Sequence, residues 1–260
     1  MESRIDKITV AKNFSKNAAF YDNNSSVQSA VASMLVKKLP SCRVGSILEI
    51  GCGTGNYTRL LRDVFKANWI KAIDISEEMV GIARGKIKDE KTYFVVSDVE
   101  TIDFNEKFSL ITSNATFHWF YNLETAIERL QKALTEDGMM VFSIFGPKTF
   151  VELKKSVSAV LRQDIPMVSD FFNDKEKINA ILEKYFKDVH TTECLLGKTY
   201  LSLGELLKKI KYSGTRGNGK EFKRVWSREL VKKIEKEYRE RFGAIKATYQ
   251  VFFCEVKCKM

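Results

Sequence analysis

The sequence predicts an α/β fold: a doubly wound, mostly parallel sheet of seven strands with helices on both faces. Three observations predict it. A short apolar strand starts at Ile47 and runs straight into a loop with glycines at positions 51, 53 and 55, which is a common start of a binding site in such sheets. Strand-like and helical patterns then alternate as far as residue 146. A later apolar run over residues 248–257 supplies a last strand.

The elements follow one another in a regular order. After the first strand, we expect further strands at 69–74, 92–97, 108–113 and 138–145, and helices near 25–39, 56–66, 76–88 and 122–134. Ser76 is the expected N-cap of the third of these helices. Beyond Gly146 and Pro147 the chain is expected to be helical to about 186, a strand over 188–201, and helical again over about 204–242.

This order divides the chain into four parts of one domain. They are an N-terminal helical lid segment (1–40), a binding core (41–146), a helical insertion (147–187) and a C-terminal part with two strands and a basic helical excursion (188–260). The two late helical segments are long enough to fold back over the sheet. We expect these helical insertions to act as lids over the pocket.

The glycine loop favours a ligand without phosphates. Gly51, Gly53 and Gly55 let the backbone turn sharply and approach a bound adenosine compound. Glu49 places a carboxylate just before the loop, where a phosphate-binding loop would avoid one. A dinucleotide fingerprint also needs glycine or alanine at its sixth position, and here that residue is Asn56.

Polar side chains recur where the expected strands end. Asp74 lies nineteen residues beyond Gly55, the spacing of a carboxylate that accepts the ribose hydroxyls, while Asp98 and Asn114 follow the next two strands. In an open α/β sheet, ligands bind at this edge. Each acid taken alone can be a helix cap, but the ordered set is not explained by capping. The sequence therefore predicts that the 41–146 core binds S-adenosylmethionine.

Composition fits one large cytoplasmic enzyme domain. The chain has 260 residues, of which 44% are hydrophobic, enough for a sizeable core. Its N-terminus is polar, and no apolar run approaches the ~18 residues of a membrane span. Five cysteines without C-x-x-C spacing and only two histidines favour reduced thiols and no metal site. Cys52, inside the glycine loop, is interpreted as a small residue in a tight space rather than as a nucleophile.

Positive charge is concentrated in one region. Residues 197–246 contain fifteen Lys and Arg against six Glu, a balance of +9, while the whole chain carries +10. This balance points to an acidic protein or a nucleic acid as partner, or to a solvated helical face. The aromatic and basic residues of the region match no known nucleic-acid motif.

Three further stretches resemble the malonyl-[acyl-carrier protein] O-methyltransferases of biotin synthesis, over almost the whole chain. They are Asn13–Asp22 with Val27 and Gln28, Ser113-Asn-Ala-Thr-Phe-His-Trp119, and Phe145-Gly-Pro-Lys-Thr-Phe-Val-Glu-Leu153. The glycine loop is shared by very many methyltransferases, whereas the last two stretches are more specific. Two departures fall on the acceptor side: His118 stands where the family usually has glutamine, and Gly214-Thr-Arg216 where Gly-Ala-Thr is common.

The resemblance implies a class I, Rossmann-like methyltransferase that esterifies the free carboxylate of a malonyl group on acyl carrier protein. A carboxylate is already ionised near neutral pH, because its reference pKa is about 4, so the acceptor needs no general base. Alignment of donor and acceptor in a dry pocket supplies most of the acceleration. The acidic carrier would account for the basic region.

Residue roles follow from the same resemblance. On the donor side, Glu49 and the three glycines shape the pocket, Asp74 holds the ribose, Asp98 and the Val99 backbone read the adenine, and Asn114 lies under the methionine part; Gln28, Ile75 and Met79 complete the set. On the acceptor side, Tyr21 either orients the carboxylate through its hydroxyl or is an aromatic staple in the helical lid. Lys211 or Arg216 pairs with the carboxylate or with the carrier. Trp119 and Phe117 either wall the sulfonium or simply pack.

Two other functions share parts of these features. A methyltransferase for a small free or coenzyme A-linked acid would keep every donor residue and would turn over acceptors that lack the carrier. A nucleic-acid-binding protein would instead use the 197–246 region and show no turnover. The acceptor assay separates the three.

Overall fold

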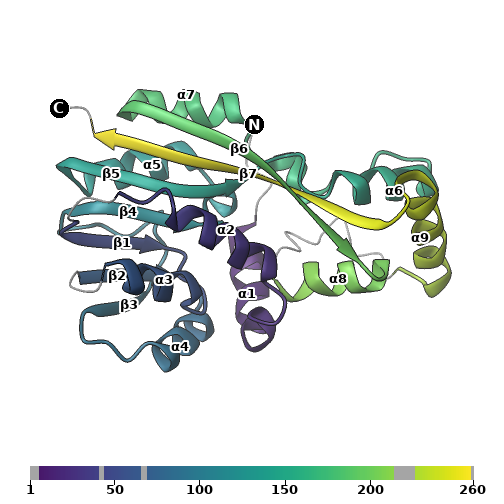
Figure 1. Cartoon of the computed structure of the whole chain (residues 1–260), viewed down its shortest axis with the longest axis horizontal. Coiled ribbons are helices and arrows are strands. Elements are labelled where there is room, and N and C mark those ends of the chain that lie inside the picture. The colour runs from purple at the N-terminus through teal and green to yellow at the C-terminus, as the bar shows by residue number, and fades with distance from the viewer. Residues whose placement is uncertain (1–5, 41–43, 66–68, 214–225, 259–260) are drawn as a thin grey trace.

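A single central sheet organises the molecule. The computed structural model describes residues 6–40, 44–65, 69–213 and 226–258. The strands are β1 (Ser46–Ile50), β2 (Trp69–Asp74), β3 (Thr92–Val96), β4 (Phe108–Asn114), β5 (Leu134–Phe145), β6 (Phe186–Tyr200) and β7 (Ile245–Cys258). Their order across the sheet is β3-β2-β1-β4-β5-β7-β6, and β7 runs antiparallel to both of its neighbours (Figure 1). The predicted doubly wound, mostly parallel sheet of seven strands is confirmed.

Helices connect and cover these strands. They are α1 (Lys7–Tyr21), α2 (Ser26–Val36), α3 (Asn56–Val64), α4 (Glu77–Lys86), α5 (Leu123–Lys132), α6 (Val151–Leu161), α7 (Lys175–Tyr185), α8 (Leu203–Tyr212) and α9 (Arg228–Phe242), with 3-10 turns η1 (Phe117–Trp119) and η2 (Val168–Phe171). Ser76 caps α4 as expected, because its hydroxyl accepts a hydrogen bond from the Met79 backbone N–H. Asp6 caps α1 in the same way through Thr9.

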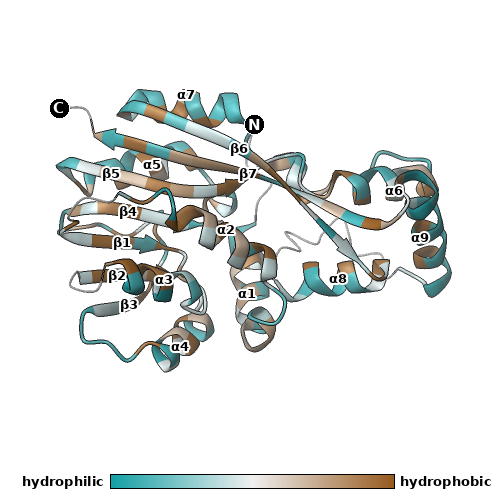
Figure 2. Ribbon diagram, viewed as in Figure 1, coloured by the Kyte–Doolittle hydropathy of each residue, from teal (hydrophilic) through white to brown (hydrophobic). Residues whose placement is uncertain are grey.

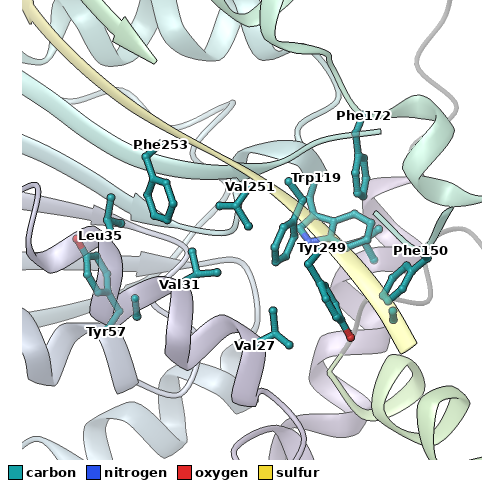
Figure 3. Packing of buried hydrophobic residues seen from close by; sticks show 14 of the residues in the cluster. Val27, Val31, Leu35, Tyr57, Trp119, Phe150, Phe172, Tyr249, Val251 and Phe253 are labelled. Atoms are coloured by element: carbon teal, nitrogen blue, oxygen red, sulfur yellow. The ribbon is translucent and has the colours of Figure 1, made fainter. Parts of the chain in front are cut away.

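The sheet buries both of its faces. Neighbouring residues of a strand point to opposite sides, so Ile47 packs in one apolar cluster with α2 and α6 while Leu48 packs in another with α5 and α7. On β7, Val251 and Phe253 belong to the first cluster, which Figure 3 shows in part. Hydrophobic residues concentrate along the strands, and the outer helices carry more hydrophilic ones (Figure 2).

Most expected elements are found with boundaries shifted by a few residues, and two of them differ more clearly. The fifth strand starts at Leu134, four residues earlier than expected, because Leu134 pairs with Phe108 of β4 before a register shift. Polar residues 135–137 hide this extension in the sequence. The expected helix over 204–242 contains α8 and α9, with residues 214–225 between them outside the described part.

Helices α6, α8 and α9 lie at one end of the sheet (Figure 1). Helix α9 packs against α6 and β7, whereas α8 packs beside α1 (Figure 1). Long strands β6 and β7 pair along most of their length and carry the chain to this end. Among the helices of the described residues, none combines the length and the apolar character that a membrane crossing requires.

Candidate active site

A pocket opens at the carboxyl ends of β1 to β4, where the sheet of this fold places its ligands. Its wall combines the glycine loop, the ends of β2 and β3, the segment after β4, and one side of α1. Of the predicted site residues, the wall contains Tyr21, Gly51, Gly53, Asp74, Ile75, Met79, Asp98, Val99 and Asn114. A smaller adjoining hollow contains Gln28 together with Tyr21, Gly51, Gly53 and Asn114. Residues far apart in the sequence therefore meet at one place.

The glycine loop turns tightly over the end of β2. Gly51 has a φ of +71°, and a Cβ atom there would lie 2.1 Å from the Thr116 Oγ1 atom. Only glycine fits that position. Gly55 serves another purpose: its φ of +82° starts α3, and a Cβ atom would lie 3.1 Å from the Cβ atom of Ala83 on α4. Gly55 does not belong to the wall, because it forms the junction between the loop and two helices.

Asp74 is held rigidly by the backbone. Its Oδ2 atom accepts a 2.8 Å hydrogen bond from the Gly53 N–H, and its Oδ1 atom accepts a 2.9 Å bond from the Ser76 N–H. Burial raises the pKa of Asp74, while the bonds from Ser76 and Gly53 oppose that rise. Each carboxylate oxygen keeps a second lone pair for a ligand hydroxyl.

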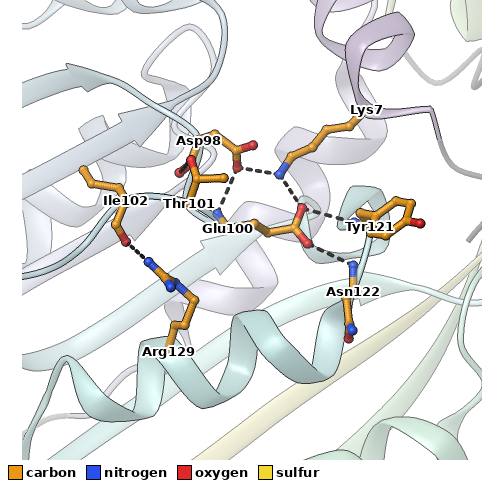
Figure 4. A network of polar contacts seen from close by, with 8 residues as sticks. All are labelled: Lys7, Asp98, Glu100, Thr101, Ile102, Tyr121, Asn122 and Arg129. Atoms are coloured by element: carbon orange, nitrogen blue, oxygen red, sulfur yellow. Dashed lines mark hydrogen bonds and ion pairs between the residues drawn. The ribbon is translucent and has the colours of Figure 1, made fainter.

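Asp98 takes part in a network that crosses from the core to α1 (Figure 4). The Lys7 ammonium, on the first turn of α1, forms ion pairs with both Asp98 and Glu100. Asp98 also accepts a 2.9 Å hydrogen bond from the Glu100 N–H, and the Glu100 carboxylate accepts bonds from the backbone N–H groups of Tyr121 and Asn122. The network ties α1 to the expected adenine end of the pocket.

Asn114 ends β4 and joins three segments. Its side-chain NH₂ donates to the Gln28 carbonyl at 3.1 Å, and its Oδ1 atom accepts a 3.0 Å bond from the Ser143 hydroxyl. Gln28 is buried on α2. The contact that it makes with Asn114 uses its backbone carbonyl, and Gln28 lines the smaller hollow.

Aromatic rings form the side of the pocket beneath α1. The Phe14 ring lies 6.2 Å from the Tyr21 ring and 6.1 Å from the Trp119 ring, between centroids, and all three residues line the pocket. Phe117 does not, because its ring packs against those of Phe120 and Phe142 within the core. Phe117 is therefore a packing residue of the core. Trp119 belongs to the pocket wall, where it could lie beside a bound sulfonium.

Tyr21 presents a neutral hydroxyl. Burial, together with the nearby carboxylates of Asp74 and Asp22, raises the pKa of Tyr21 above its ordinary value. The side chain is partly exposed and borders the pocket. Within the described residues its hydroxyl has no hydrogen-bond partner, so it is available as a donor to a bound anion.

The end of α1 is fastened to the glycine loop by Asp22. Its carboxylate accepts hydrogen bonds from the Thr54 hydroxyl at 2.5 Å and the Asn56 side-chain amide at 2.9 Å, and pairs with Lys86. Burial opposes ionisation, but the bonds from Lys86, Thr54 and Asn56 outweigh it and lower the pKa of Asp22. Helix α1 is thus held at both ends, by Lys7 and by Asp22.

Glu49 lies behind the pocket rather than in its wall. It is wholly buried on β1, and its carboxylate oxygens complete no hydrogen bond with the described residues. Burial raises the pKa of Glu49 to about 8; the nearby Thr58 hydroxyl opposes the rise without forming a complete bond. Because side chains alternate along a strand, Ile50 reaches the pocket and Glu49 does not.

Of the two predicted basic acceptor residues, the structure describes Lys211, which lies apart from this pocket. Lys211 is exposed on α8, where its ammonium lies 5.1 Å from the centroid of the Tyr212 ring. It does not belong to the pocket wall. Arg216 falls outside the described residues.

Two buried groups carry no catalytic chemistry of their own. Burial lowers the pKa of His118 to about 3, and the ring packs against Trp119, Phe145 and Phe172. Burial raises the pKa of the Cys52 thiol well above its usual value, which disfavours a nucleophilic thiolate. Within the described residues, no cluster of His, Cys, Asp and Glu could hold a metal ion.

The sequence did not single out Lys7, Phe14, Asp22, Thr116 or Glu100. Phe14 and Asp22 lie in the conspicuous stretch 13–22, and a helical reading of that stretch would have placed Phe14 and Tyr21 two turns apart on one face. The partners of Lys7 and Asp22 are 91 and 32 residues distant. Local sequence patterns do not predict contacts between residues so far apart in the sequence.

Comparisons with known proteins agree with this site. Residues 48–142 match the family described as "Methyltransferase domain". The chain is 33% identical to the malonyl-[acyl-carrier protein] O-methyltransferase of Acetivibrio thermocellus, covering 98% of this chain and 95% of that protein. It is 30% identical to the enzyme of the same name from Bacillus anthracis, with 97% of each chain covered.

Solved structures share the fold. The YcgJ protein from Bacillus subtilis superposes with a TM-score of 0.63 at 16% identity, covering 89% of this chain and 99% of that one. The N-methyltransferase NodS from Bradyrhizobium japonicum, crystallised with S-adenosyl-l-homocysteine, gives a TM-score of 0.57 at 15% identity, covering 97% and 100%. At these identities the likeness concerns the fold.

Proposed function

This chain belongs to the malonyl-[acyl-carrier protein] O-methyltransferase family, and we propose that it transfers a methyl group from S-adenosylmethionine to the free carboxylate of malonyl-[acyl-carrier protein]. The product is the malonyl methyl ester that enters pimeloyl synthesis for biotin, in the cytoplasm. The observation that carries the proposal is the pocket in which the glycine loop, Asp74, Asp98 and Asn114 meet beneath Tyr21. The relatives of the same name match over nearly their whole length.

The pocket residues suit the methyl donor. Gly51 leaves no room for a side chain beside Thr116, so the backbone forms the floor on which an adenosine compound would lie. The Asp74 carboxylate would accept from the ribose hydroxyls, and Asp98 with the Val99 backbone would meet the adenine edge. Ile75 and Met79 offer apolar contact to the ring. When bound, the donor supplies a methyl group on a cationic sulfonium.

The acceptor side needs a positioning group rather than a base. The malonyl carboxylate is ionised near neutral pH, so no residue has to remove a proton from it. The neutral Tyr21 hydroxyl can donate a hydrogen bond to one carboxylate oxygen and leave the other free to react. Phe14 and Trp119 line the pocket with apolar surface, and a pocket kept dry in this way would favour a reaction in which opposite charges cancel.

Lys211 keeps a role only outside this pocket. Its ammonium is exposed on α8, where it can contact the carrier or the outer part of its arm. We therefore assign the orientation of the carboxylate to Tyr21 and leave Arg216, outside the described residues, as the basic alternative. The acidic carrier would dock on the basic 197–246 region, and a nucleic-acid partner is not part of the proposal.

Mass spectrometry of the acceptor tests the function. Malonyl-[acyl-carrier protein], malonyl-coenzyme A and free malonate are each incubated with the protein and S-adenosylmethionine. We expect one added methyl group on the carrier-bound malonyl. Methylation of the two small acceptors only would keep the donor site and assign the protein to small carboxylic acids. No methylation of any acceptor would refute the proposed activity.

A further inference from the structure

The positive side chains of residues 197–246 differ in whether a nearby glutamate pairs with them. On α9, four cations are paired with a glutamate one turn away: Lys233 with Glu229, Lys236 with Glu240, Arg239 with Glu235 and Arg241 with Glu237. Such pairs cancel most of the field of this helix at a distance. Helix α9 also packs on α6, at the end of the molecule away from α1 (Figure 1).

Helix α8 differs in this respect. Its exposed positions recur at Gly204, Lys208 and Lys211, the spacing of one helix face. Neither lysine forms an ion pair with a described residue. Lys209, on the adjacent face, donates a 2.7 Å hydrogen bond to the Asn23 carbonyl and so fixes α8 against the turn that follows α1.

The outer face of α1 continues this surface. Exposed side chains recur every four residues as Ile8, Lys12, Lys16 and Phe20. Lys12 and Lys16 have no ion pair among the described residues, although both border a shallow hollow that also contains Glu78. Phe20 is 54% exposed and Ile8 is 68% exposed. These two side chains offer apolar surface on a charged face, against which a partner protein could pack.

The two helices form one surface at the pocket. The Phe20 ring on α1 lies 5.1 Å from the Tyr212 ring on α8, between centroids. The inner side of the same α1 lines the pocket with Val10, Phe14 and Tyr21. A protein docked on the outer side of α1 would therefore lie about one helix diameter from the pocket.

We propose that the exposed faces of α1 and α8, made of Ile8, Lys12, Lys16, Phe20, Lys208 and Lys211, form the docking surface for the acidic acyl carrier protein. The inference rests on the proposed function. Unpaired lysines attract and orient an acidic partner over a range of about a Debye length, and the two apolar side chains give it a place to pack. Helix α9 contributes little to docking.

Two variants with equal charge change test the surface. In the first, Lys12, Lys16 and Lys208 are replaced by glutamine; in the second, Lys232, Lys233 and Lys236 of α9 are. Both lose three positive charges, and neither alters a residue of the donor pocket. Steady-state methylation of malonyl-[acyl-carrier protein] is measured at low ionic strength, and the affinity for S-adenosylhomocysteine is measured by calorimetry.

We expect the KM for the carrier substrate to rise about 10-fold in the α1/α8 variant and less than about 2-fold in the α9 variant, with kcat and the donor affinity unchanged in both. Equal rises, or a larger rise in the α9 variant, would overturn the proposal. A loss of donor affinity that accounts for the rise would also overturn it, because it would assign these lysines to the donor site. Wild-type protein inactive on the carrier substrate would instead refute the proposed function.

Discussion

Tyr21 is the residue whose environment points most directly to the acceptor. Its hydroxyl is neutral and borders the pocket. We expect Tyr21→Phe to lower kcat/KM for the malonyl carrier substrate by roughly 10- to 100-fold, since a hydrogen bond to a charged group contributes about 1.5–3 kcal/mol. Initial rates at saturating donor measure the effect, and calorimetry with S-adenosylhomocysteine is the control. Wild-type rates from the variant would show that another group holds the carboxylate.

Glu49 makes a residue-scale prediction about pH. Its folded pKa of about 8 lies above the ordinary value of about 4.3, so the folded state binds the extra proton between these two values. The contribution of Glu49 to stability is therefore complete below about pH 4 and is lost as the pH rises toward 8, with a slope of at most about 1.4 kcal/mol per pH unit.

Glu49→Gln removes this titration while keeping the shape of the side chain. We expect the free energy of unfolding of the variant, relative to wild type, to increase from pH 5 to pH 8.5 in urea melts. Thr58→Val, which alters the neighbouring hydroxyl, should leave most of the wild-type pH slope. If the unfolding free energies of Glu49→Gln and wild type change in parallel across this pH range, the Glu49 carboxylate is not protonated in the folded protein.

At the scale of elements, α1 is a cover held by its ends. Lys7 pairs with Asp98 and Glu100 in a partly buried network, so its removal should loosen the first turns of the helix. For Lys7→Met we expect about 5-fold faster hydrogen exchange in the first turns of α1 without donor, equivalent to about 1 kcal/mol. Lys12→Met, one turn along and unpaired within the described residues, should exchange like wild type. Identical exchange in both variants would mean that Lys7 does not fasten the cover.

The same element shows where sequence patterns stop being informative. The expected strand ends at or just before Asp74, Asp98 and Asn114 are confirmed, because apolar runs and their polar endings are local signals. From the sequence, we expect the pocket to be covered by residues 1–40 and by the late helical segments together. Among the described residues, the pocket wall takes its covering residues from α1, since the long β6 and β7 pair carries α6 and α9 beyond the pocket.

The direction of side chains and the pairing of charges could not be predicted from the sequence either. Glu49 and Ile50 are neighbours in sequence, yet one faces the core and the other the pocket. The net charge of 197–246 is a property of composition. How much of that charge faces solvent unpaired depends on helix geometry, as the four glutamate pairs of α9 show.

For the whole molecule, the charge distribution predicts different salt responses of the two substrates. The carrier is acidic and would meet exposed lysines, an attraction that is screened when the Debye length falls from about 10 Å at 0.1 M salt to about 3 Å at 1 M. The donor would be held mainly by the buried Asp74, backbone groups and apolar contacts. We expect the KM for the carrier substrate to rise steeply with sodium chloride, while the Kd for S-adenosylhomocysteine changes less than about 2-fold. Equal salt sensitivity would contradict this prediction, because it would mean that the basic surface does not act on the carrier alone.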